Sequence, residues 1–245
     1  MNTDPGSQNT SSTQWSLIVA AGETGAAGAE ALAALCRRYW PAVYAFIRGR
    51  VKSTEDAQDL TQEFFARFLE RGAFARADPG RGKFRAFLFT SVRNFLSDEA
   101  ESRRAVRRGG GVRVFSFDFS RYDSQPGFDP PGTESPESAF HRQWAQSLLA
   151  QTLDRMREEF QADGRLREFD LLLPYLSGPP PGEGHDSLAR KLNVSEPAAR
   201  QAASRFRKRY KSALRDEIAQ TLAEPVPENI DAELRELFAA VQAAH

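Results

Sequence analysis

The spacing of apolar residues in the segment 53–72, STEDAQDLTQEFFARFLERG, is the feature that most constrains the fold. Leu60, Phe64 and Phe68 recur every four residues, which places their side chains on one face of an α-helix. The Ser-Thr pair that opens the segment can cap the helix, and the acids that follow favour its positive end. The pattern therefore predicts an amphipathic helix whose apolar face packs against other helices.

The same spacing recurs along most of the chain and predicts an all-α fold. Further helices are expected at 13–22, 28–38, 84–108, 139–160, 166–176 and 230–243. Pro41 is expected in the first turn of a separate helix, because its fixed φ suits that position. The alternating segment VRVFSFDF is compatible with one short strand within an otherwise helical chain.

Composition and residue inventory exclude several classes of protein. The 245 residues are 40% hydrophobic and 27% charged, which suits a globular chain with room for two modest domains. The absence of a long apolar run or a secretory signal, and the single cysteine, Cys36, predict a cytoplasmic protein without membrane insertion. The three histidines lie far apart, and no phosphate-binding loop or nucleophile elbow occurs. We therefore expect no enzyme activity, no metal and no cofactor.

Breaks in the helical pattern divide the chain into five parts. Glycine, proline and polar residues dominate the segment that follows Arg108, which is the composition of a flexible linker. The predicted parts are a flexible tail (1–12), a first helical domain (13–108), the linker (109–138), a second helical domain (139–222) and a C-terminal extension with an amphipathic helix (223–245).

Positive charge concentrates in the second domain although the chain has 33 acids and 33 bases. In SLARKLNVSEPAARQAASRFRKRYK, a short helix, a tight turn and a second helix capped by Ser195 are typical of a helix-turn-helix. One face of the second helix is apolar, and the other carries the residues expected to enter a DNA major groove: Arg200, Gln201, Ser204, Arg205 and Lys208. The alternative is a basic face that only contacts solvent.

Three segments together resemble the extracytoplasmic-function (ECF) sigma factors of bacterial RNA polymerase. They are DAQDLTQEFFARFLE (56–70), DPGRGKFRAFLFTSVRNFLSDEAESRR (78–104) and the helix-turn-helix segment, in the order found in that family. The resemblance covers about 28–108 and 140–222 and implies a region 2 helical bundle followed by region 4. The linker is longer than is usual in the family, and the helix at 230–243 lies outside the shared part.

The resemblance also implies partners and site residues. Polymerase core is expected to bind through the clamp of its beta-prime subunit and its beta flap, and the clamp is expected to contact Asp56, Asp59, Gln62 and Glu63. The minus-ten element of promoter DNA is expected to contact Phe74, Lys83, Arg93, Asn94, Arg103 and Arg104, and the minus-thirty-five element the helix-turn-helix. Phe84, Phe87 and Phe95 are expected in the core because they follow helical spacing.

Other functions are left open by these patterns. The acids of 56–70 can be ordinary solvated residues, and the arginines near 103–108 can be the charged start of the linker. The whole chain can be a helix-turn-helix transcriptional regulator that binds duplex DNA without polymerase, or a helical adaptor that binds RNA or protein. An anti-sigma factor or a regulatory kinase is a further candidate partner. We also hypothesise that the helix at 230–243 packs on one domain and regulates access to DNA or polymerase.

Overall fold

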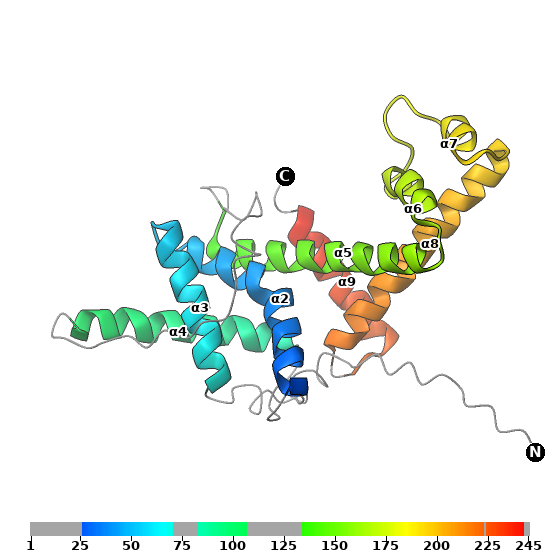
Figure 1. Cartoon of the computed structure of the whole chain (residues 1–245). Coiled ribbons are helices and arrows are strands. Elements are labelled where there is room, and N and C mark those ends of the chain that lie inside the picture. Colours follow the sequence, from blue (N-terminus) through cyan, green and yellow to red (C-terminus); the bar gives the residue numbers. More distant parts are fainter. Residues whose placement is uncertain (1–25, 71–82, 107–133, 223, 243–245) are drawn as a thin grey trace, which may run out of the picture. The chain divides into compact units, whose positions relative to one another are not determined.

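The structure is a computed structural model that describes residues 26–70, 83–106, 134–222 and 224–242. Every regular element in these ranges is helical, which confirms the predicted all-α class (Figure 1). The elements are α2 (Ala26–Arg48), α3 (Thr54–Glu70), α4 (Phe84–Val106), α5 (Pro136–Ala162), α6 (Leu166–Leu172), a 3₁₀ turn (Leu173–Tyr175), α7 (His185–Leu192), α8 (Glu196–Thr221) and α9 (Pro227–Gln242). The helix predicted at 13–22 and the strand in 112–119 lie outside the described residues.

The chain forms two compact units. Unit 1 comprises residues 1–144 and 219–245, so it contains α2, α3, α4, the start of α5 and α9. Unit 2 comprises Ala145–Ile218 and contains the rest of α5, α6, α7 and most of α8. Two segments far apart in sequence therefore build unit 1. None of the helices in the described ranges is long and apolar enough to cross a membrane.

The core of unit 1 is an aromatic cluster between α2, α3 and α4. Trp40 of α2 stacks on Phe65 of α3 with ring centroids 5.6 Å apart. Phe64 of α3 meets Phe95 of α4 edge to face at 5.6 Å. Such pairs contribute about 0.5–1.5 kcal/mol beyond the burial of their area. The apolar stripe predicted on 53–72 thus packs α3 against both neighbours.

The prediction that Pro41 begins a separate helix is wrong. Helix α2 runs without a break from Ala26 to Arg48, with Pro41 in its interior. A proline inside a helix removes one hydrogen bond and costs about 3 kcal/mol. Tyr39, Trp40 and Val43 are almost completely buried on either side of it. The burial of these side chains outweighs the local preference and keeps the helix continuous.

Helix α3 begins as its sequence predicts. The side-chain oxygen of Ser53 accepts a hydrogen bond of 3.2 Å from the backbone N–H of Asp56, so Ser53 is the N-cap. Thr61 is fully buried, and its hydroxyl donates to the carbonyl of Ala57 at 2.6 Å. That bond allows a polar side chain to lie within the apolar face, since a buried hydroxyl without a partner would be costly.

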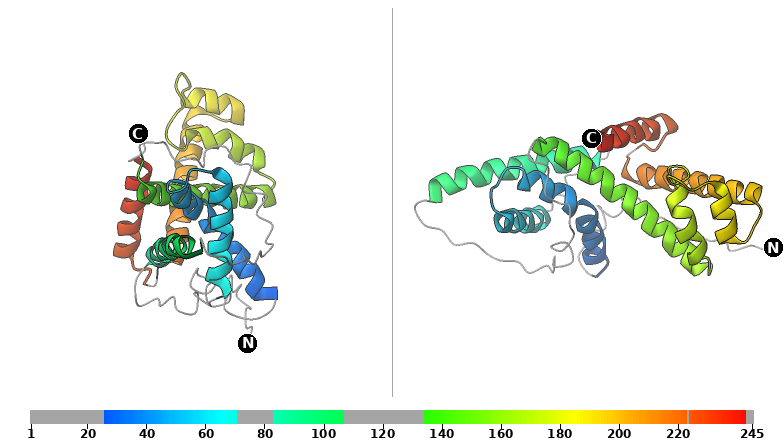
Figure 2. Two further views of the ribbon diagram at one scale, coloured as in Figure 1. Left: turned by 90° about the vertical axis from the view of Figure 1, so that its left-hand side faces the viewer. Right: turned by 90° about the horizontal axis from the view of Figure 1, so that it is seen from above.

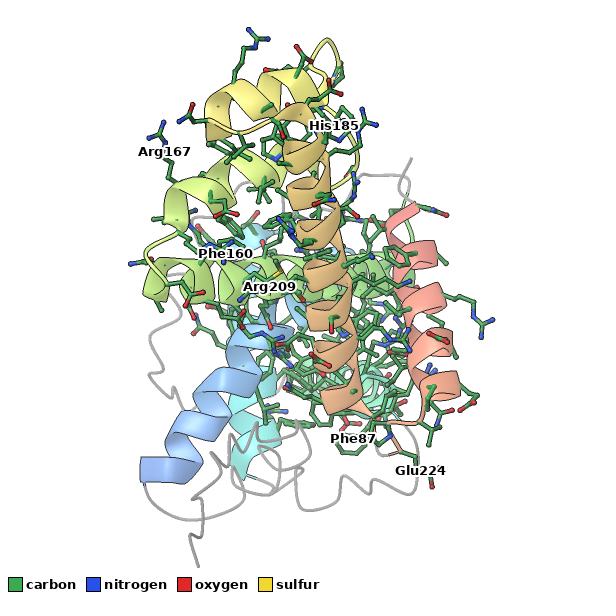
Figure 3. All side chains as sticks on the ribbon, turned by 90° about the vertical axis from the view of Figure 1, so that its right-hand side faces the viewer. Phe87, Phe160, Arg167, His185, Arg209 and Glu224 are labelled. Carbon is green, nitrogen blue, oxygen red and sulfur yellow. The ribbon has the colours of Figure 1, made fainter. Side chains whose placement is uncertain are left out.

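Unit 2 is built around three mutually contacting phenylalanines. Phe160 of α5, Phe169 of α6 and Phe206 of α8 meet edge to face at centroid distances of 5.6, 5.9 and 5.5 Å. The guanidinium of Arg209 covers the Phe160 ring at 4.7 Å, and both residues are labelled in Figure 3. Burial raises the pKa of Tyr210 to about 12, and its hydroxyl donates to the carbonyl of Leu149. These contacts fix α8 to α5 and α6.

Candidate nucleic-acid and polymerase interfaces

A tight turn joins α7 to α8. Asn193 adopts the left-handed conformation, with φ 56°, directly after α7. The N–H of Asn193 donates to the carbonyl of Arg190, and the N–H of Val194 donates to that of Ala189, which is the paired pattern of a Schellman cap. Asparagine tolerates this conformation better than most residues. The NVS segment therefore ends α7 sharply and is followed at once by α8, the order of elements predicted for a helix-turn-helix.

The loop before α7 is anchored by one carboxylate. Glu183 accepts hydrogen bonds from Lys191 at 2.7 Å, from the hydroxyl of Tyr175 at 3.1 Å and from that of Ser187 at 3.2 Å. The hydrogen bond from Lys191 is the main reason that the pKa of Glu183 is held below its ordinary value. The network ties the 3₁₀ turn to both ends of α7. In unit 2, α6, α7 and the first half of α8 lie side by side (Figure 2).

Helix α8 presents cations on the face opposite its core contacts. Ala199 and Ala203 are fully buried in the same cluster as Leu188 of α7, and their small side chains allow close packing of the two helices. The five predicted DNA-binding residues lie on the remaining perimeter: Arg200, Gln201, Arg205 and Lys208 are exposed, and Ser204 is partly exposed. Arg200 pairs with Glu196 one turn earlier at 2.7 Å. This face therefore presents side chains that can donate hydrogen bonds to a partner in solution.

The four predicted polymerase-binding residues all lie on α3. Asp56 and Asp59 are exposed, whereas Gln62 and Glu63 are partly buried. Glu63 accepts from Arg67 at 2.5 Å, and Arg67 also reaches Glu99 of α4 at 2.8 Å. Glu63 therefore helps to join α3 to α4. Asp56 and Asp59 are the more accessible acids of the set.

The predicted minus-ten residues are described only in part. Arg93 and Asn94 are exposed on α4, and Lys83 lies just before its first turn. Phe74 and the side chains of Arg103 and Arg104 lie outside what the structure describes. Phe84 and Phe95 are buried, as their spacing predicts, and Phe87 is half-buried against Phe68 and Phe84. Arg93 and Asn94 are therefore the most accessible of the described residues in this set.

A buried charge cluster around Arg85 was not predicted from the sequence. Its guanidinium donates to Glu233 at 3.0 Å and to Glu236 at 2.6 Å, both on α9. The same group contacts the ring nitrogen Nδ1 of His141 at 2.8 Å and covers the ring of Trp144 at 4.1 Å. The signal in the sequence was an arginine within the apolar run FRAFLF. The cluster joins α4, α5 and α9.

The charges of this cluster shift the pKa of its neighbours. Burial, and then the nearby Arg85, lower the pKa of His141, so its imidazole is held neutral. Burial alone would raise the pKa of Glu236, but hydrogen bonds from Lys83 and Arg85 outweigh it and hold that pKa below its ordinary value. The cluster therefore favours a charged Glu236 and a neutral His141 beside one arginine.

Comparison with known proteins finds one family model that matches part of unit 1. The model of sigma-70 region 2 matches residues 35–106, which span most of α2, all of α3 and all of α4. No curated protein and no solved structure matches the chain. A region 2 domain supports a role in binding RNA polymerase core and recognising promoter DNA. The match therefore shows that residues 35–106 are similar to sigma-70 region 2.

Proposed function

We propose that the protein is an ECF-type sigma factor that directs polymerase core to promoters with two recognition elements. Unit 1 binds the core and the opened minus-ten element, and the helix-turn-helix of unit 2 binds the minus-thirty-five element as duplex. The region 2 match at 35–106 carries the proposal, because it supports polymerase binding by a chain in which a tight turn also joins α7 to the basic helix α8.

The charge of the two units supports this division of labour. Asp56 and Asp59 are exposed acids on α3, and they suit a basic surface on the polymerase clamp. Arg200, Arg205 and Lys208 are exposed cations on α8, and they suit phosphates and guanine edges of a major groove. A neutral chain thus carries two interfaces of opposite sign. We expect the predicted domain limits, 13–108 and 139–222, to describe the two functional parts.

Polymerase binding is tested by co-purification of the full chain with core enzyme, followed by transcription on a library of genomic fragments. We expect transcripts that begin downstream of one shared two-part motif. Asp56→Lys with Asp59→Lys should reduce capture of core at least about tenfold, because like charges replace complementary ones. The matched control is Glu228→Lys, an exposed acid outside the predicted interface. Unchanged capture of the α3 variant would contradict the assignment.

Duplex recognition is tested separately. Arg200→Ala with Arg205→Ala should abolish promoter-dependent transcripts. In a plot of the logarithm of the duplex binding constant against the logarithm of salt concentration, the slope should become shallower by about 0.9 for each phosphate that the variant no longer neutralises. Arg167→Ala is the control, because Arg167 is an exposed cation on α6, away from α8 in Figure 3. Binding to duplex DNA without any capture of core polymerase would instead indicate a conventional helix-turn-helix regulator.

A further inference from the structure

Helix α9 directs two acids toward the start of α4. Glu233 has only 1% of its side chain exposed, and it lies 2.5 Å from the Lys83 ammonium and 3.0 Å from the Arg85 guanidinium. Glu236, one turn further along, contacts the same two cations at 2.7 and 2.6 Å. Each cation therefore has two carboxylates of α9 as partners. Leu237 is the buried apolar residue of the helix, and Phe238 is half exposed.

Charge complementarity matches α9 to the start of α4. Removing two carboxylates from water is costly, and the attraction of their partners does little more than offset that cost. A buried ion pair is therefore weak evidence for added stability, but it is strongly selective for the charge of the partner. Any anion that offers oxygens at the same spacing can replace the carboxylates. Phosphate groups bind lysine and arginine in the same way.

The cations that α9 covers lie where a DNA strand is expected. Lys83 precedes the first turn of α4 and is one of the predicted minus-ten contacts. Arg85 also contacts His141 and Trp144, which belong to α5 and not to α9, so its guanidinium has partners that do not depend on α9. The carboxylates of α9 and the phosphates of a strand therefore require the same donors.

We propose that α9 is an autoinhibitory element whose Glu233 and Glu236 occupy Lys83 and Arg85 in place of the phosphates of single-stranded DNA. The inference rests on the proposed function, because it takes the start of α4 as a strand-binding site. DNA must displace α9 before it can contact both cations. If the displaced state is populated at about 10% or less, the apparent affinity of unit 1 for a strand is lowered about tenfold or more.

The test measures binding of a labelled single-stranded oligothymidylate to the full chain by fluorescence anisotropy. All variants carry Arg200→Ala and Arg205→Ala, so that α8 contributes little. Glu233→Gln with Glu236→Gln should tighten binding about tenfold or more. The matched control is Glu224→Gln with Glu228→Gln, which removes two exposed charges from the same C-terminal segment. The control should bind within about twofold of the parent.

A third variant tests whether the tighter strand binding arises only from the lower negative charge of the whole chain. Adding Lys83→Gln to Glu233→Gln/Glu236→Gln should remove most of the gain, because the gain is assigned to the freed cations. Equal affinity of Glu233→Gln/Glu236→Gln and its matched control would overturn the inference, and so would a gain that survives Lys83→Gln. Absence of binding by every variant would also overturn it.

Folding and the proposed function are checked on the same samples. If Glu233→Gln/Glu236→Gln loses helical content by circular dichroism, the measurement is made with Glu236→Gln alone. The Glu236 carboxylate is half exposed, so its replacement should disturb folding less. That single variant should tighten binding about threefold, and no change would overturn the inference. Capture of core polymerase separates the two claims: capture with unchanged strand affinity refutes only the role of α9, whereas absent capture refutes the proposed function.

Discussion

The ion pair between Arg85 and Glu233 predicts a specific pattern of stabilities. The two side chains are 10% and 1% exposed, so Arg85→Met leaves a buried carboxylate with Lys83 as its remaining partner in the pair network. Breaking a buried pair in this way costs about 3–5 kcal/mol of unfolding free energy. Arg85→Met with Glu233→Met should recover most of that loss, because apolar residues of similar volume usually replace such a pair without penalty.

Urea unfolding followed by tryptophan fluorescence measures this pattern. The ring of Trp144 lies 4.1 Å from the Arg85 guanidinium, so its emission reports on the cluster. Arg235→Met is the matched control, because Arg235 is exposed on the same helix α9. The reasoning would be refuted if Arg85→Met cost no more than this control, or if the double variant were as unstable as Arg85→Met alone.

Three further changes test other parts of the fold. Phe206→Ala should cost unit 2 about 3–5 kcal/mol, since it opens a cavity beside Phe160 and Phe169, and a loss below about 1 kcal/mol in urea titrations would contradict that packing. Asn193→Val should cost about 1–2 kcal/mol, because a β-branched residue resists φ 56°, whereas Asn193→Gly should keep Tm at or above the parent value. The contribution of His141 to the stability of unit 1 should be present above its ordinary pKa of 6.5 and should be lost as the pH falls, because the folded chain lowers that pKa and therefore binds fewer protons than the unfolded chain. His141→Gln should remove this part of the pH dependence in titrations between about pH 5 and 7.

Local patterns predicted the individual helices well. The Ser53 cap, the apolar stripe of α3 and the buried Phe84 and Phe95 follow from residue spacing, because each depends on neighbours within a few turns. The continuous helix through Pro41 could not be predicted in this way. Its propensity cost is local, but the burial that overcomes it comes from α3 and α4, which lie elsewhere in the sequence.

The candidate sites were predictable to different degrees. The cations of α8 form a dense local pattern beside a recognisable turn, so their exposure on one face followed from the sequence. The cluster around Arg85 joins residues separated by 148 positions in the chain. No periodicity connects such positions, so only the fold shows that Glu233 and Glu236 are partners of Lys83 and Arg85. The helix predicted at 230–243 is present as α9, but the sequence alone does not distinguish its acids from ordinary surface residues.

The discontinuity of unit 1 has a consequence for synthesis of the chain. Residues 145–218 are translated after the segment that carries Lys83 and Arg85 and before the segment that carries α9. Glu233 lies 148 positions after Arg85, so at about 5–20 residues per second the nascent chain spends roughly 7–30 s with these cations uncovered. During this interval the nascent chain exposes Lys83 and Arg85, which α9 covers in the finished protein. Another acidic molecule can therefore bind these two cations before α9 is made.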